Sequence, residues 1–289
     1  MKEGLVIKAK YGVYVVFLDN VFYNCKKRGS LNKDKQNITV GDIVIFDESD
    51  LMIEEIKERK SLLKRPNIAN IDQLIIIFSI VEPDFSYYLA FKYLTYANKY
   101  NLDAKIILTK VDKVDNDNKI NEIKETFNDL NIEIFPLSNK SKVGLEEAKR
   151  IFKNKISCLI GQSGVGKSSL LNAFDQNYNR SEGEYSVALG RGKHETKETI
   201  LLPYEGGYIA DTPGFSSLDL ELYKEDLAKY FPGFMHRSEK CYFADCLHIS
   251  EHKCVVKEDL CKGLIPKIAY ETYLKLSNDA ISYVKRYQK

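Results

Sequence analysis

The sequence contains few of the residues that mark fibrous or disordered chains. Only 16 glycines and 7 prolines occur among 289 residues, which excludes a collagen-like repeat and a mucin-like stalk. Hydrophobic residues make up 44% of the chain, so enough apolar surface is available for a core and a wholly disordered chain is excluded. The length predicts about two domains.

Long apolar runs and a strong charge of one sign are also missing. The longest apolar run, residues 74–81, is far shorter than the ~20 residues of a membrane-spanning helix. The N-terminal segment lacks the apolar core of a signal peptide. With 43 basic and 41 acidic residues the formal net charge is +2, which argues against a chain-wide surface for nucleic acid. We expect a cytoplasmic monomer with no membrane partner, in which any nucleic-acid site comes from local patches and not from the bulk charge.

Three segments of different pattern follow one another. Residues 1–65 alternate short apolar runs with turn residues, which predicts a small closed barrel of the OB or SH3 type. This segment carries 13 basic and 10 acidic residues; Lys26, Lys27 and Arg28 are either an RNA contact of the barrel or a solvated loop. Residues 66–218 alternate buried strands with helices, as in a doubly wound α/β domain. Residues 219–289 contain a Cys/His cluster and a helical tail.

A phosphate-binding loop is the strongest motif in the sequence. Residues 161–168 read GQSGVGKS, which matches G-x-x-x-x-G-K-[ST] between a predicted strand, 155–160, and a predicted helix from residue 168. Backbone N–H groups of such a loop surround phosphate oxygens, while Lys167 reaches the β- and γ-phosphates and Ser168 binds Mg²⁺. The predicted nucleotide-binding residues here are Gly161, Gln162, Ser163, Gly164, Val165, Gly166, Lys167, Ser168 and Ser169.

Three further loops complete a guanine nucleotide site. Asp211 and Gly214 belong to a D-x-x-G motif after the apolar strand 208–210, where the carboxylate can hold Mg²⁺ and the glycine N–H can meet the γ-phosphate. Asp112 can accept hydrogen bonds from the N1–H and exocyclic amine of guanine, which adenine cannot offer. The two predicted base-binding loops contain Thr109, Lys110 and Asp112, and Ser138, Asn139 and Lys140.

The order of these loops is unusual. The base-binding loops precede the phosphate-binding loops, whereas the phosphate loop comes first in an ordinary GTPase. Joining the ordinary termini and opening the chain elsewhere preserves the spatial site, because nearby termini tolerate circular permutation. The D-x-x-G loop then leads directly into the C-terminal segment, and we expect hydrolysis to move or loosen that segment.

Six cysteines are present, and four of them fall between residues 241 and 261. This clustering argues against a disulfide framework and favours a metal site in a cytosolic chain. Three thiolates and one imidazole form a closed tetrahedral set for one structural Zn²⁺; the ligands are Cys241, Cys246, His248 and Cys254. We expect His252 to face solvent, Cys261 to pack in the interior, and Cys25 and Cys158 to be small buried residues of strands.

The permuted motif order, the N-terminal barrel and the Cys/His segment together resemble the ribosome small-subunit-dependent GTPase family RsgA, also called YjeQ or EngC. The resemblance covers essentially the whole chain. It implies a multidomain α/β protein: a barrel that contacts ribosomal RNA over 1–65, a circularly permuted GTPase domain over 66–218 and a mainly helical zinc-binding domain over 219–289. It also implies a GTPase of late small-subunit maturation whose hydrolysis of GTP to GDP the subunit stimulates.

The resemblance extends to the first switch loop, with one departure. The family pattern there is a Gly-basic-His-Thr-Thr run, and this chain has Gly192, Lys193, His194 and Thr196 but Glu195 in place of a threonine. We assign Thr196 to Mg²⁺, with Thr199 as the alternative. A second departure is Thr109, where asparagine is common.

The catalytic group is not the usual one. Ras-type GTPases position water with a glutamine directly after D-x-x-G, and here that residue is Phe215. We hypothesise that His194 orients the water; the alternative is that it contacts only RNA or solvent. Two other functions stay open at this stage. One is an RNA-binding scaffold with a structural nucleotide, and the other is an ATPase without preference for GTP.

Overall fold

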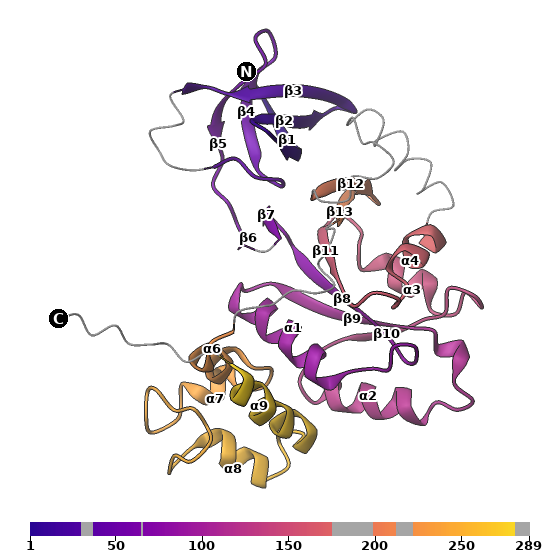
Figure 1. The fold of residues 1–289 in the computed structure, drawn as a ribbon, viewed down its shortest axis with the longest axis vertical. Helices are drawn as coiled ribbons and strands as arrows, with labels where there is room; N and C mark the ends of the chain where they lie inside the picture. The colour runs from indigo at the N-terminus through magenta and orange to yellow at the C-terminus, as the bar shows by residue number, and fades with distance from the viewer. Residues whose placement is uncertain (30–36, 65, 175–198, 212–221, 281–289) are drawn as a thin grey trace, which may run out of the picture. The chain divides into compact units, whose positions relative to one another are not determined.

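The computed structural model describes residues 1–29, 37–64, 66–174, 199–211 and 222–280 (Figure 1). The chain divides into two compact units, one formed by residues 1–75 and 144–218 and the other by residues 76–143 and 219–289. The three segments predicted from the sequence, with boundaries after residues 65 and 218, stay a prediction. None of the helices among the described residues is long and apolar enough to cross a membrane.

The first unit begins with a closed five-stranded barrel, as the alternating pattern predicts (Figure 1). Its strand order is β1-β2-β3-β5-β4, in which only the β3–β5 pair is parallel. The strands are β1 (Lys2–Lys10), β2 (Val13–Leu18), β3 (Val21–Lys27), β4 (Ile43–Asp47) and β5 (Met52–Ile56). The interior is a buried cluster of Val6, Val16, Cys25, Ile38, Val44, Phe46 and Ile53. Apolar side chains at alternate strand positions therefore supply the barrel core.

A six-stranded sheet with the order β10-β9-β8-β11-β13-β12 follows the barrel. Its strands are β8 (Gln73–Ser79), β9 (Asp103–Thr109), β10 (Ile134–Pro136), β11 (Ile156–Ile160), β12 (Ile200–Tyr204) and β13 (Gly207–Asp211). Every residue of β8 is buried, as expected for an apolar run inside a parallel sheet. The β9–β10 and β11–β13 pairs are parallel. The α/β prediction is confirmed.

Strand β12 is not among the strands that the sequence predicts. It runs antiparallel to β13 and forms a hairpin with it through Glu205 and Gly206, both in the left-handed region. Pro203 weakens the strand signal because proline cannot donate a ladder hydrogen bond, and such a residue is tolerated in an edge strand. The sheet is therefore mixed at this end.

Short elements join these parts. Strands β6 (Leu62–Lys64) and β7 (Asn67–Ala69) form a two-stranded sheet between the barrel and β8. Helices α3 (Leu145–Arg150) and α4 (Lys167–Phe174) belong to the first unit, and α1 (Tyr87–Lys99), η2 (Val111–Lys113) and α2 (Asn118–Asn128) to the second.

The C-terminal segment is mainly helical and packs on α1 within the second unit. It contains α6 (Lys224–Tyr230), α7 (Met235–Ser238), α8 (Val255–Cys261) and α9 (Lys267–Asp279). Helix α1 contacts α6 and α9. The ring of Phe231 stacks on Phe91 at 4.9 Å between centroids and lies 5.4 Å from the fully buried ring of Tyr273. Aromatic burial, the largest apolar contribution per side chain, thus joins this segment to α1.

Candidate functional site: phosphate loop, base-binding loops and metal centre

The phosphate-binding motif has the local structure that the sequence predicts. Strand β11 ends at Ile160, a loop follows, and α4 begins at Lys167. Gly164 and Gly166 adopt positive φ values of 82° and 94°, a backbone conformation that costs energy for residues with a Cβ. Val165 is fully buried and anchors the loop on the core. The glycine positions of the motif therefore have a direct conformational reason.

The Lys167 side chain lies over its own loop. Its ammonium group donates hydrogen bonds to the carbonyl oxygens of Gly161 and Gln162, the latter at 2.8 Å. Desolvation by burial lowers the pKa of Lys167. An anionic phosphate oxygen is a stronger acceptor for this ammonium than a peptide carbonyl, so the group is well placed to bind phosphate.

The magnesium-binding residues predicted from the sequence are only partly within the described chain. Ser168 is exposed in the first turn of α4. Asp211 is the last residue of β13 and its backbone pairs with Ile200. Thr196, Gly214 and His194 lie outside the described residues. Thr199, the alternative to Thr196, directly precedes β12.

The base-binding loops are held together within the second unit by Ser138. This side chain is fully buried, and its hydroxyl donates a hydrogen bond to Oδ1 of Asp112. Oγ of Ser138 also accepts hydrogen bonds from the N–H groups of Lys140 at 3.2 Å and Ser141 at 3.0 Å. The hydroxyl hydrogen bond lowers the pKa of Asp112. Asp112 is therefore kept as a carboxylate, the form that accepts from a guanine edge.

Thr109 and Lys110 are also fixed by contacts that the sequence does not reveal. The buried Thr109 hydroxyl donates to the carbonyl of Phe78 at 3.2 Å, so this side chain links strands β9 and β8 of the sheet. Lys110 has a left-handed φ of 60°, and its ammonium group donates to the carbonyl of Glu82.

Asn139 carries an unsatisfied acceptor in this site. Its Oδ1 atom is buried and has no hydrogen-bond partner within the described part of the chain. An unpaired buried carbonyl costs free energy. An amine or N–H group of a bound base would satisfy it, and the loop thus fits a nucleotide base.

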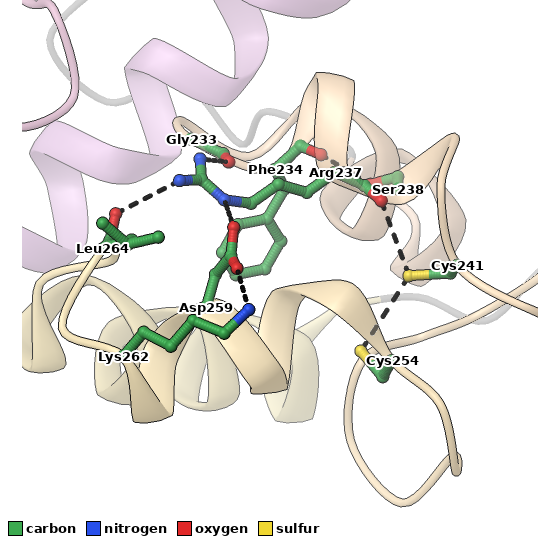
Figure 2. Close-up of polar contacts among 9 residues, drawn as sticks. All are labelled: Gly233, Phe234, Arg237, Ser238, Cys241, Cys254, Asp259, Lys262 and Leu264. Carbon is green, nitrogen blue, oxygen red and sulfur yellow. Dashed lines mark hydrogen bonds and ion pairs between the residues drawn. The ribbon is translucent and has the colours of Figure 1, made fainter.

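The four predicted metal ligands come together, as the spacing predicts. The thiol and imidazole ligand atoms of Cys241, Cys246, His248 and Cys254 all lie within 4.8 Å of one another. The Sγ atoms of Cys241 and Cys254 are 4.0 Å apart, and Figure 2 shows them facing each other. In a tetrahedron with Zn–S bonds of ~2.3 Å the edge is ~3.8 Å. The cluster therefore fits a tetrahedral metal ion.

Hydrogen bonds determine which nitrogen of His248 faces the thiols. The ring is fully buried, and Nε2 lies 3.0 Å from the carbonyl of Ala228 and 3.2 Å from the hydroxyl of Ser238. Nδ1 lies 3.3 Å from Sγ of Cys254. Because the Ala228 carbonyl accepts a hydrogen bond from Nε2–H, the proton of the neutral ring is on Nε2 and the Nδ1 lone pair is free to bind a metal.

The donor chemistry agrees with this geometry. Burial raises the pKa of Cys246 to about 12 and also raises that of Cys254. A buried thiol loses its proton when a cation takes the proton's place, so ion binding and folding of the loop are coupled here.

The remaining cysteine and histidine predictions had mixed outcomes. His252 is exposed, and Cys25 and Cys158 are fully buried, as predicted. The prediction that Cys261 packs in the interior is wrong, since it is exposed at the end of α8. The helix presents its other face to the core there, with Val256 fully buried.

Several residues that support the metal loop were missed by sequence reasoning. The Tyr270 hydroxyl donates to the carbonyl of His248 at 2.7 Å, and the Tyr273 hydroxyl to the carbonyl of Leu247. The i, i+3 spacing of these tyrosines on a predicted helix is the available signal. Arg237 was missed too. Its guanidinium donates to the carbonyl oxygens of Gly233 and Leu264 at 2.7 and 3.2 Å and to the carboxylate of Asp259 at 2.8 Å; Figure 2 draws these contacts.

The phosphate loop follows a strand, and the base-binding loops precede it in the sequence. Together with the three-thiol, one-imidazole cluster that follows, this order defines a circularly permuted P-loop GTPase. The RsgA GTPase family model matches residues 56–221, and the RsgA N-terminal domain model matches residues 3–51. The chain belongs to the RsgA GTPase family and is a GTP-hydrolysing enzyme.

Full-length relatives agree with this assignment. The chain is 40% identical to the small ribosomal subunit biogenesis GTPase RsgA of Geobacillus sp. (strain WCH70), over 99% of this chain and 100% of the relative. It is 38% identical to the protein of the same name from Staphylococcus aureus (strain MRSA252), with the same coverage.

Solved structures are similar over nearly the whole chain as well. The crystal structure of YjeQ from Thermotoga maritima superposes with a TM-score of 0.82 at 34% identity, covering 96% of this chain and 97% of that one. YloQ, a circularly permuted GTPase, gives 0.79 at 32% identity, covering 96% and 94%.

The Ser138→Ala variant tests the electrostatics of the base-binding loops. Without the hydroxyl hydrogen bond we expect a higher pKa for Asp112, measured by NMR titration of its carboxyl carbon. Because the native pKa is depressed, the stabilisation from the carboxylate is present above the usual aspartate pKa and is lost as the pH falls through the native value. In the variant this stabilisation should be smaller at neutral pH, because the pKa of Asp112 is less depressed.

Ser141→Ala is the matched control, because Ser141 contacts Ser138 through its backbone N–H. An Asp112 titration that is the same in Ser138→Ala as in wild type would contradict the assignment.

Proposed function

We propose that this GTPase binds the small ribosomal subunit and its rRNA and assists late maturation of the subunit. GTP hydrolysis to GDP and phosphate acts as a docking and release switch that the subunit stimulates. The observation that carries the proposal is the phosphate loop with Lys167 at the start of α4, in a chain whose full-length relatives are named small ribosomal subunit biogenesis GTPases. The proposed partner implies a cytoplasmic location, and we propose that the protein acts as a monomer.

The roles of individual residues follow from their chemistry. Residues 161–169 would surround the phosphates, and Asp112, supported by Ser138, would select guanine. Lys110 would lie along the base and Asn139 would contact it, with Thr109 and Lys140 shaping the loops. Gly214 would meet the γ-phosphate. Ser168, Thr196 and Asp211 are the proposed Mg²⁺ ligands.

Hydrolysis is transfer of the γ-phosphoryl group to water. The water oxygen bonds to the γ-phosphorus while the bond to the β-phosphate oxygen breaks, giving GDP, phosphate and one released proton. Bound Mg²⁺ would neutralise charge on the phosphates. Lys167 would stabilise the negative charge on the β- and γ-oxygens. His194 would orient the attacking water, since Phe215 cannot.

We propose zinc as the ion of the Cys/His cluster. Three thiolates and one imidazole match its preferred soft and borderline ligands, and four protein ligands leave no position for substrate. The role of the ion would be structural, holding residues 241–254 together.

Metal analysis tests the zinc proposal. Purified protein should contain about one zinc per chain, and Cys254→Ser should contain close to none, because a buried ligand is lost. Cys261→Ser is the matched control, since this exposed thiol is not in the cluster. We would measure the metal by inductively coupled plasma mass spectrometry. Equal zinc in Cys254→Ser and wild type would rule out this site.

A phosphate-release assay with isolated small subunits tests the function. Subunits should strongly increase wild-type turnover, and Lys167→Ala should lower GTP affinity by about 100-fold or more through loss of a charge-assisted contact. The exposed Lys153→Ala variant is the control. Turnover that does not respond to subunits would favour the alternative, an RNA-binding scaffold in which the nucleotide is structural.

The His194→Ala variant tests the proposed catalytic group. With GTP affinity intact, loss of a water-orienting imidazole should reduce subunit-stimulated turnover by roughly 100-fold. Nucleotide affinity measured by fluorescence titration separates catalysis from binding. Unchanged stimulated turnover would show that His194 contacts only RNA or solvent.

A further inference from the structure

The barrel contacts the rest of the first unit through an unusually close backbone approach. The N–H of Ala69 donates to the carbonyl of Val40 at 2.8 Å, and the Asn70 side-chain amide donates to the carbonyl of Gly41 at 2.8 Å. Gly41 has a φ of 90°, and a Cβ at this position would lie 2.1 Å from the Ala69 carbonyl oxygen. Only glycine permits this contact.

A buried ion pair holds the same barrel loop. The carboxylate of Asp42 is fully buried and accepts hydrogen bonds from Nε and Nη2 of Arg59, at 2.6 and 2.8 Å. The N–H of Thr39 donates to it at 2.8 Å. A bidentate arginine pair has a defined geometry, so the loop is fixed in orientation on the segment that leaves the barrel.

The hydrogen-bond chain continues from this segment to β11. Asn70 accepts the N–H of Lys60 at 2.9 Å, and the Lys60 ammonium group pairs with Asp72. Asp72 then contacts the first residue of β11 twice. Its N–H donates to the carbonyl of Ile156 at 2.9 Å, and its carboxylate accepts the N–H of Ile156 at 2.7 Å.

A second contact joins the barrel to β13. The ring of Phe17 on β2 meets the ring of Tyr208 edge to face, with the centroids 6.4 Å apart, and β1 contacts β12. Strand β11 leads into the phosphate loop and β13 ends at Asp211. The barrel therefore contacts β13 near its start directly, through Phe17 and Tyr208, and reaches the start of β11 through Asn70, Lys60 and Asp72.

We propose that Asn70 and Asp72 are positioning residues of partner-stimulated GTP hydrolysis, through which a partner held by the barrel acts on the phosphate loop. The inference rests on the proposed function, because the partner is the subunit RNA. A partner changes turnover only if its binding free energy is coupled to the phosphate site, and such coupling is reciprocal for binding. The hydrogen bonds from Gly41 through Asn70, Lys60 and Asp72 to Ile156 form a continuous physical path for it.

The kinetic test compares basal and subunit-stimulated GTP hydrolysis. Asp72→Ala and Asn70→Gly should leave basal kcat and KM close to wild type and lower the stimulation ratio by about tenfold or more. Glycine retains the left-handed backbone of Asn70 without strain. Asp72→Asn, which keeps an acceptor for the N–H of Ile156, should restore the ratio. A merely structural role would lower both rates together and leave the ratio unchanged, which would overturn the proposal.

Hydrogen exchange of the free protein separates this inference from the proposed function. A non-hydrolysable GTP analogue should change amide protection in residues 39–42 and 67–72 of wild type, and the change should be absent in Asp72→Ala. If the analogue leaves these amides unaffected in wild type, the coupling is refuted whatever the subunits do. If the amides respond and the subunits still fail to stimulate wild type, the coupling stands and the proposed function fails.

Discussion

The pairing of Asp72 with the first residue of β11 is the constraint that connects the barrel to the phosphate-binding part of the first unit. A phosphate loop works only when its backbone N–H groups converge on one point, and its position is set by the strand that precedes it. Strand β11 is bonded to Asp72 at its start and paired with β13 from Ile156 to Cys158. Because the start of the strand is fixed, the positive-φ glycines of the loop turn the backbone at a defined position.

In the second unit, buried polar groups fix the orientation of the side chains that face a ligand. Ser138 satisfies the Asp112 carboxylate and two backbone N–H groups from one fully buried oxygen. In the metal loop, Ala228 and Ser238 contact one nitrogen of His248 and leave the other facing the thiols. In both places the partners of a buried polar group determine which atoms remain available for a ligand, and this is a source of specificity rather than of net stability.

The sequence predicts the parts of the site that depend on local spacing. GQSGVGKS requires only a strand before it and a helix after it, and the four metal ligands lie within 14 residues, so both were predicted by residue number. Contacts between distant residues were not. The hydroxyl of Thr109 bonds to Phe78, and Asp72 bonds to Ile156, 84 positions away. The exposure of Cys261 and the edge strand β12 likewise depend on which face of an element the fold covers.

The path from the barrel to β11 is polar throughout, and this has a physical consequence. An apolar contact of the same size would stabilise the connection but would tolerate small sliding, because hydrophobic packing has no preferred direction. Bidentate pairing of Arg59 with Asp42 and the paired bonds of Asp72 lose most of their energy when the geometry changes. A displacement of the barrel is therefore either resisted or passed on to Ile156. The close approach of Gly41 to Ala69 leaves little space for the two backbones to slide past each other instead.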